Sequence, residues 1–69
     1  MNFTLDCELE TDGRWLAEVL ELPGALAYGA SRDEAMAKVE VLALRILAER
    51  LEHGEVGAIA INIALPAAA

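Results

Sequence analysis

Carboxylates are the most abundant side chains of this chain that could do chemistry. The sequence holds twelve aspartate and glutamate residues against five lysine and arginine residues, so its formal net charge is −7. Several converging carboxylates can hold the divalent metal ions that hydrolyse phosphodiesters. Asp6, together with Glu34 or Glu40, could supply such a site if the elements that carry these residues met at one point.

The single serine, cysteine and histidine of the chain do not form a catalytic set. Ser31 stands three residues before Glu34, the spacing of a capping box, in which both side chains bind free amides at a helix start. Cys7 alternates with apolar residues and is expected in the core. His53 precedes a glycine at the end of a helical segment, where it would interact with the last carbonyls. We therefore expect no catalytic residue, no metal ligand and no cofactor, and the chain also lacks a glycine-rich phosphate loop.

Four short segments are expected to form strands, because apolar and polar residues alternate within them or because residues typical of turns stand at their ends. They cover residues 2–10, 14–21, 25–28 and 58–65. The Asp12–Gly13 pair marks a tight hairpin turn between the first two. Pro23 and Gly24 suit the two central positions of a type II turn before the third. The buried face of the first strand would carry Phe3, Leu5, Cys7 and Leu9.

One helix is expected from about Arg32 to Glu52, where good helix formers dominate and a glycine follows the end. One apolar stripe would pack on the sheet and consists of Ala35, Met36, Val39, Leu42, Ala43, Ile46 and Leu47. A second stripe on the opposite side consists of Ala37, Val41, Leu44, Ala48 and Leu51. The polar sector left over covers only about a quarter to a third of the circumference, where a surface helix normally shows half or more.

A helix with two apolar sides needs cover on both. The second stripe is expected to meet another subunit or a partner, or else to lie under the C-terminal segment of the same chain. The candidate oligomer interface consists of Val41, Leu44, Ala48 and Leu51.

The order β-β-β-α-β predicts an α+β fold in which one long helix packs on a four-stranded mixed sheet, with a right-handed crossover to the last strand. This order resembles the first part of the ribonuclease H fold. Nucleases of that type need a carboxylate on the first strand, one on the helix and one near the end of the fourth strand. Here the fourth strand ends in Ala64, Leu65 and Pro66, which offer no carboxylate. A two-metal site would be incomplete, so we expect no nuclease activity.

Size and charge favour binding over catalysis. A chain of 69 residues forms one small domain with a marginal core, yet 57% of its residues are apolar, so the excess is expected to meet another chain in a homo-oligomer or a complex. The acidic surface would repel phosphate backbones and suits a basic protein partner. The start of the chain shows no secretory leader, and the longest apolar run, 14 residues, is too short to span a bilayer. We expect a cytoplasmic protein that does not bind membranes.

Several short motifs follow one another within residues 12–39. The positions concerned are Asp12, Gly13, Trp15, Ala17, Val19, Leu22, Pro23, Gly24, Tyr28, Gly29, Glu34 and Ala35. This stretch resembles the N-terminal domain of the HicB-like antitoxin family. That family typically shows an Asp-Gly turn, an aromatic residue opening the second strand, P-x-L-P-G-C, a glycine before Ser or Thr, and an E-E-A helix opening. Leu20 and Ala25 depart from the frequent proline and cysteine, and both changes are apolar.

The resemblance implies a partial ribonuclease H-like domain without catalysis, which neutralises a small basic toxin ribonuclease by covering it, as in a toxin-antitoxin system. Candidates for contacting that partner are the carboxylates expected on outward strand faces, Asp6, Glu8, Glu10 and Glu18. Many family members continue into a DNA-binding domain, whereas this chain stops at Ala69. We expect a single domain over residues 1–69 that does not bind DNA directly. The alternative is a stand-alone oligomeric HicB-like domain that binds a small ligand or RNA.

Overall fold

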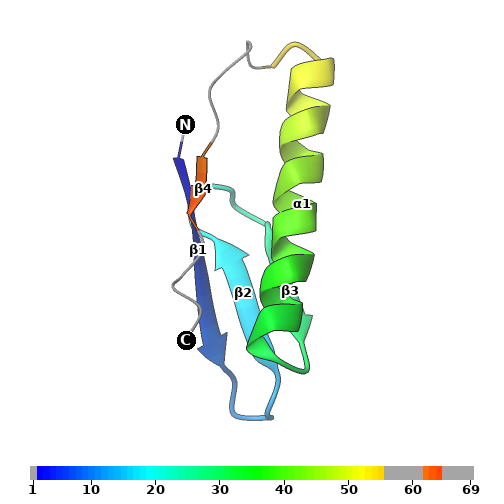
Figure 1. The fold of residues 1–69 in the computed structure, drawn as a ribbon. Helices are drawn as coiled ribbons and strands as arrows, with labels where there is room; N and C mark the ends of the chain where they lie inside the picture. Colours follow the sequence, from blue (N-terminus) through cyan, green and yellow to red (C-terminus); the bar gives the residue numbers. More distant parts are fainter. Residues whose placement is uncertain (1, 56–61, 65–69) are drawn as a thin grey trace.

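Three antiparallel strands and one helix form the two layers of this molecule. The structure is a computed structural model that describes residues 2–55 and 62–64. Its elements are β1 (Asn2–Leu9), β2 (Trp15–Val19), β3 (Leu26–Gly29), α1 (Arg32–Glu52) and β4 (Asn62–Ala64). The helix runs along one face of the sheet, and no described element covers the other face (Figure 1). The predicted α+β class is confirmed.

The three antiparallel strands follow one another in space as they do in sequence. Leu5 of β1 lies opposite Val19 of β2, and Ala17 of β2 lies between Cys7 on β1 and Ala27 on β3. This register brings the buried residues of the strands to one face, which is the face that α1 covers.

The short segment β4 lies on the other side of β1. Its three residues pair in parallel with Asn2–Thr4, so the strand order is β3-β2-β1-β4. Of the final strand expected over 58–65, residues 58–61 and 65 lie outside the described residues. Two parallel strands must be joined by a crossover connection, and α1 is part of the chain that connects β1 to β4.

The hairpin between β1 and β2 turns at the predicted Asp12–Gly13 pair. The Glu10 N–H donates to the Arg14 carbonyl at 2.7 Å, and the Gly13 N–H donates to the Glu10 carbonyl at 3.0 Å. Gly13 has a φ of +89°, while Asp12 keeps a negative φ. These are the features of a three-residue loop closed by a glycine bulge, whereas a two-residue turn with Asp-Gly at its centre would need a positive φ at both. As a result, β2 begins at Trp15, one residue later than predicted.

The type II turn predicted at Pro23–Gly24 is present. The Ala25 N–H donates to the Leu22 carbonyl at 3.0 Å, and Gly24 has a φ of +89°. Glycine accepts this left-handed conformation without the steric cost that a Cβ would bring. The Leu22 side chain is buried and anchors the turn in the core.

The helix begins with the predicted serine cap. The Ser31 Oγ accepts a hydrogen bond from the Glu34 N–H at 3.1 Å. The Glu34 Oε1 accepts from the Ala30 N–H at 3.3 Å and from the Lys38 ammonium at 3.1 Å. The glutamate therefore binds the amide one residue before the cap, and not the Ser31 amide that a reciprocal capping box would use.

The helix ends at the predicted position. Gly54 has a φ of +68°, and the Glu55 N–H donates to the Arg50 carbonyl at 2.9 Å, as in a Schellman motif. His53 interacts with a late carbonyl through its backbone, since its N–H donates to the Glu49 carbonyl at 3.0 Å. Its imidazole instead lies 3.9 Å from the Glu55 carboxylate. The bounds Arg32–Glu52 agree with the prediction.

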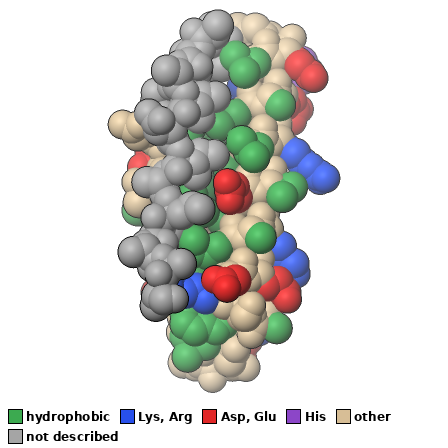
Figure 2. Space-filling view, in the orientation of Figure 1, with side chains coloured by type: hydrophobic (Ala, Val, Ile, Leu, Met, Phe, Trp, Pro, Cys, Tyr) green, Lys and Arg blue, Asp and Glu red, His purple; other side chains and the backbone are tan. Residues whose placement is uncertain are grey.

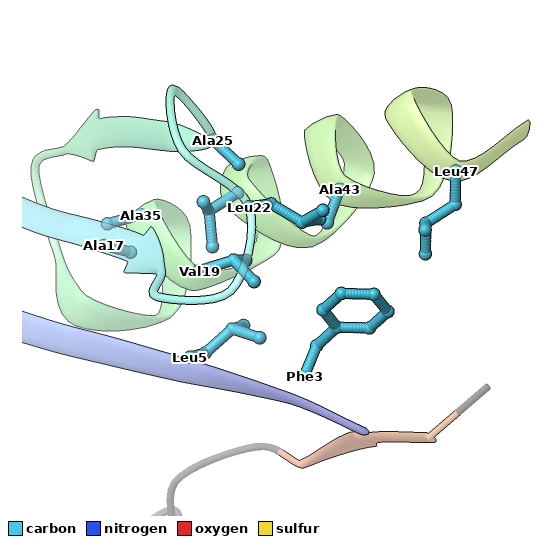
Figure 3. Close-up of a cluster of buried hydrophobic side chains, with 10 residues drawn as sticks. Phe3, Leu5, Ala17, Val19, Leu22, Ala25, Ala35, Ala43 and Leu47 are labelled. Atoms are coloured by element: carbon cyan, nitrogen blue, oxygen red, sulfur yellow. The ribbon is translucent and has the colours of Figure 1, made fainter. Parts of the chain in front are cut away.

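The core lies between α1 and the sheet (Figure 3). The buried side chains are Phe3, Leu5, Ala17, Val19, Leu22, Ala25, Ala35, Val39, Ala43 and Leu47. Met36, Leu42 and Ile46 pack against them at the rim, so the predicted inner stripe of the helix is confirmed. Cys7 is half-buried and also packs on the core.

Leu9 does not share the burial predicted for its face of β1. It shares a face with Phe3 and Leu5, yet 58% of its surface is exposed. The β1–β2 hairpin extends past the first turn of α1 (Figure 1), and Leu9 is the last residue of β1 before the hairpin loop.

Candidate functional site

The sheet face opposite α1 is the candidate site, because no element among the described residues covers the side chains on this face (Figure 1). We call it the open face. Its members, set by alternation with the buried residues and by strand register, are Thr4, Asp6, Glu8, Leu16, Glu18, Leu20, Leu26 and Tyr28. They form cross-strand rows, one of which runs Asp6–Glu18–Leu26 and the next Glu8–Leu16–Tyr28.

Two carboxylates face each other at the centre of this surface. Asp6 on β1 lies directly opposite Glu18 on β2, and Glu8 follows two residues along β1. Like charges at directly opposed positions destabilise a sheet. None of the ion pairs found among residues 2–55 involves these three carboxylates. The open face therefore holds a concentration of negative charge that a cationic side chain from outside would stabilise.

Glu10, the fourth predicted contact residue, lies at the hairpin end of this group. It follows the end of β1, and its backbone N–H and carbonyl close the hairpin loop through Arg14 and Gly13. Asp6, Glu8 and Glu18 thus lie within the strands of the open face, and Glu10 lies one residue past the end of β1.

Apolar side chains border the carboxylates on β2 and β3. Leu20, Leu26 and Tyr28 are exposed on the open face. The Arg14 guanidinium lies over the Tyr28 ring, 4.2 Å from its centroid, and its Nε donates to the Asp12 Oδ2 at 2.7 Å. The positive guanidinium is attracted to the ring face, so Arg14 and Tyr28 stabilise each other at this end of the open face.

The Arg14–Tyr28 stack was not predicted from the sequence. The sequence did contain one indication of it: Arg14 stands two residues before Leu16, so alternation assigns both side chains to the same face of the sheet. Alternation does not give the strand register, which sets Leu16 opposite Tyr28 and so makes Arg14 a diagonal neighbour of Tyr28.

Three other carboxylates have lowered pKa values because they accept structural hydrogen bonds. The Arg14 backbone N–H, followed by its guanidinium, lowers the pKa of Asp12. The Thr4 backbone N–H lowers the pKa of Glu21. The Lys38 ammonium, followed by the Ala30 N–H, lowers the pKa of Glu34. These groups hold a hairpin, a strand end and a helix start, so their charge serves the fold.

Neither Asp6 with Glu34 nor Asp6 with Glu40 forms a metal centre here. Within residues 2–55 and 62–64, no group of three or more histidine, cysteine or acidic side chains is placed to hold a metal ion. Asp6 lies on the open face, whereas Glu34 and Glu40 lie on the helix across the sheet. In the same part of the chain, the one helix does not combine the length and hydropathy required to cross a membrane.

Replacing Asp6 with lysine is expected to stabilise the fold by about 0.5–1 kcal/mol, because an opposed like-charge pair becomes an attractive one. Urea unfolding of Asp6→Lys and of the wild-type chain at equal concentration measures the difference. Glu49→Lys is the control: it makes the same charge change at an exposed helix position and should shift stability by less than about 0.5 kcal/mol. A less stable Asp6→Lys variant would show that the two carboxylates do not repel each other.

Comparison with protein-family models, with curated proteins and with solved structures found no match for this chain.

Proposed function

We propose that this chain is an antitoxin-like protein-binding module, which would neutralise a small basic toxin ribonuclease by covering it with the open face. The observation that carries the proposal is the opposed Asp6–Glu18 pair, with Glu8 beside it, on a sheet face that no described element covers. Lysine or arginine side chains of a partner would relieve this repulsion and would become desolvated between the two proteins.

The apolar part of the open face supports a protein partner over a small ion. Leu20, Leu26 and Tyr28 are exposed next to the carboxylates. A protein interface typically combines an apolar centre, often aromatic, with charged groups that set orientation. A partner with basic residues beside apolar ones would match both parts of this surface.

The resemblance of residues 12–39 to HicB-like antitoxins supports the same role, and we propose that the fold is the partial ribonuclease H-like domain of that family. The element order and the parallel pairing of β4 with β1 support this arrangement. The other reading of the resemblance is a module that binds RNA or a small ligand. The negative open face would repel an RNA backbone, so we favour the protein partner.

Co-expression with a small basic protein encoded beside this chain tests the proposal. The expected result is copurification at a fixed ratio, relief of the growth arrest that the neighbour causes alone, and inhibition of its RNA cleavage in a purified assay. A neighbour that binds this chain but cleaves RNA at an undiminished rate would contradict neutralisation. The absence of any toxic neighbour would favour the stand-alone module.

Charge reversal on the open face is expected to weaken that complex. Asp6→Lys should raise the dissociation constant by about a hundredfold, because an attractive interfacial contact becomes a repulsive one. Glu49→Lys, with the same change in net charge, should leave the constant within about threefold. Since Asp6→Lys is also expected to stabilise the free chain, lost binding would not reflect unfolding. Equal affinity for both variants would assign the partner to another surface.

A further inference from the structure

The second stripe of α1 lies uncovered within the described residues. Val41 and Leu44 are each 49% exposed and Leu51 is 40% exposed, while Ala37 and Ala48 are also exposed. Figure 2 shows hydrophobic side chains along the length of the helix, interleaved with charged ones. The side of the same helix that packs in the core consists of other residues, Ala35, Val39, Ala43 and Leu47, so this stripe is not part of the core.

The spacing of the stripe is that of a coiled-coil seam. Positions 37, 41, 44, 48 and 51 are separated by four, three, four and three residues, which is a heptad a/d repeat. Val41 and Ala48 take the a positions, and Ala37, Leu44 and Leu51 take the d positions. Such a seam packs knobs into holes against another helix with the same repeat.

We propose that a second copy of this chain packs antiparallel on the second stripe, about a two-fold axis between Leu44 and Ala48. In an antiparallel pair each a position lies against a d position of the other helix, so the isologous contact is self-complementary. Leu44 meets Ala48 of the second copy, and Val41 meets Leu51 of the second copy. Each leucine is matched with a smaller side chain, which keeps the distance between the helices even.

Charge complementarity supports a copy of the same chain as the occupant. Lys38 and Glu52 flank the stripe at e positions near opposite ends of α1. The antiparallel arrangement brings Lys38 of each copy, whose ammonium also binds the Glu34 carboxylate of its own helix, to Glu52 of the other, which gives two attractive contacts. Arg45 meets its counterpart near the axis, where its exposed, flexible side chain turns to solvent.

Side-chain volume selects the antiparallel orientation. A parallel in-register pair would also have complementary charges, because Glu40 would approach Arg45 of the second copy. It would, however, pair alanine with alanine at positions 37 and 48 and leucine with leucine at 44 and 51. Paired alanines leave gaps between the helices. The paired leucines nearby hold the helices apart, so these gaps cannot close.

This proposal does not rest on the proposed function, and it uses the opposite side of the molecule. The dimer forms through α1, while the open face of the sheet stays accessible in each copy (Figure 1). A failure of one proposal therefore leaves the other intact.

Light scattering of the purified chain tests the dimer. One copy has a mass of 7.4 kDa, so twice 7.4 gives 14.8 kDa for the dimer. Leu44→Glu should convert it to the 7.4 kDa species and raise the dissociation constant by at least about a hundredfold, with unchanged helical circular dichroism. Leu26→Glu makes the same change at an exposed leucine of the open face and should leave the dimer intact. A monomeric wild-type chain, or dissociation by Leu26→Glu and not by Leu44→Glu, would overturn the proposal.

Oxidative cross-linking tests the orientation, in a background where Cys7→Ala removes the native thiol. Mixed Val41→Cys and Leu51→Cys chains should form a disulfide with each other, because the antiparallel seam brings these positions together. Each of the two variants alone should not cross-link. Efficient cross-linking of Val41→Cys with itself would indicate parallel helices and contradict the antiparallel seam.

Discussion

Gly29→Ala is expected to destabilise the fold by about 3 kcal/mol, because there is no room for even one methyl group at this position. A Cβ on Gly29 would lie 2.5 Å from the backbone nitrogen of Ala35 and 3.0 Å from its Cα. Both atoms belong to the first turn of α1, so no side chain can rotate away to make space. Either β3 or the helix start must move, and both are held by the core. Thermal unfolding should show a loss of at least about 10 °C in Tm.

Gly24→Ala is the matched control for this experiment. Gly24 has a φ of +89° but nothing within 4 Å of an added Cβ. The methyl group there costs only backbone strain, about 1–2 kcal/mol. The effect of Gly29→Ala should therefore exceed that of Gly24→Ala, although only Gly24 adopts a left-handed conformation. The opposite order would mean that β3 and α1 are not in rigid contact.

The helix was the most predictable element, because its signals are local. The serine cap at Ser31, the uninterrupted run of helix formers and the stop at Gly54 gave both ends correctly. The inner stripe could also be predicted, since helical periodicity alone decides which residues share a side. Exposure of the second stripe follows from the same periodicity, and what covers it stays a prediction.

The strands were less predictable, because their ends depend on partners far away in the sequence. The second strand was expected to continue to Glu21 but ends at Val19, where the chain enters the turn around Leu22. The Glu21 carboxylate instead accepts the Thr4 N–H at 2.8 Å and so stands in for a strand hydrogen bond. A hydrogen bond from a side chain that replaces one from a neighbouring strand cannot be predicted from the alternation of apolar and polar residues.

The candidate site was partly predictable for the same reason. Alternation placed Asp6 and Glu8 on one face of β1, but only the register of the hairpin shows that Asp6 lies directly opposite Glu18. That register depends on the three-residue loop closed by Gly13, and a two-residue loop would have shifted every pair. The opposed carboxylates, which carry the proposed function, are therefore a property of the folded sheet.

Phe3→Ala is expected to have the largest effect on stability of any single truncation in β1. Only 1% of the Phe3 side chain is exposed, and it packs in the core under α1 (Figure 3). Removing a buried aromatic ring costs about 3–5 kcal/mol through lost burial and the cavity left behind. A domain of 69 residues typically has about 3–10 kcal/mol in total, so this variant should be partly unfolded at 25 °C.

Leu9→Ala on the same face of the same strand provides the comparison. Alternation alone would assign the two residues equal burial, whereas Leu9 is 58% exposed because the hairpin extends past the helix. Its truncation should cost less than about 1 kcal/mol. Urea unfolding at one fixed protein concentration, which holds any contribution of self-association constant, measures both variants. Similar losses for the two would mean that Leu9 is covered in solution, and the end of the hairpin would then have to be counted among the contact surfaces of the protein.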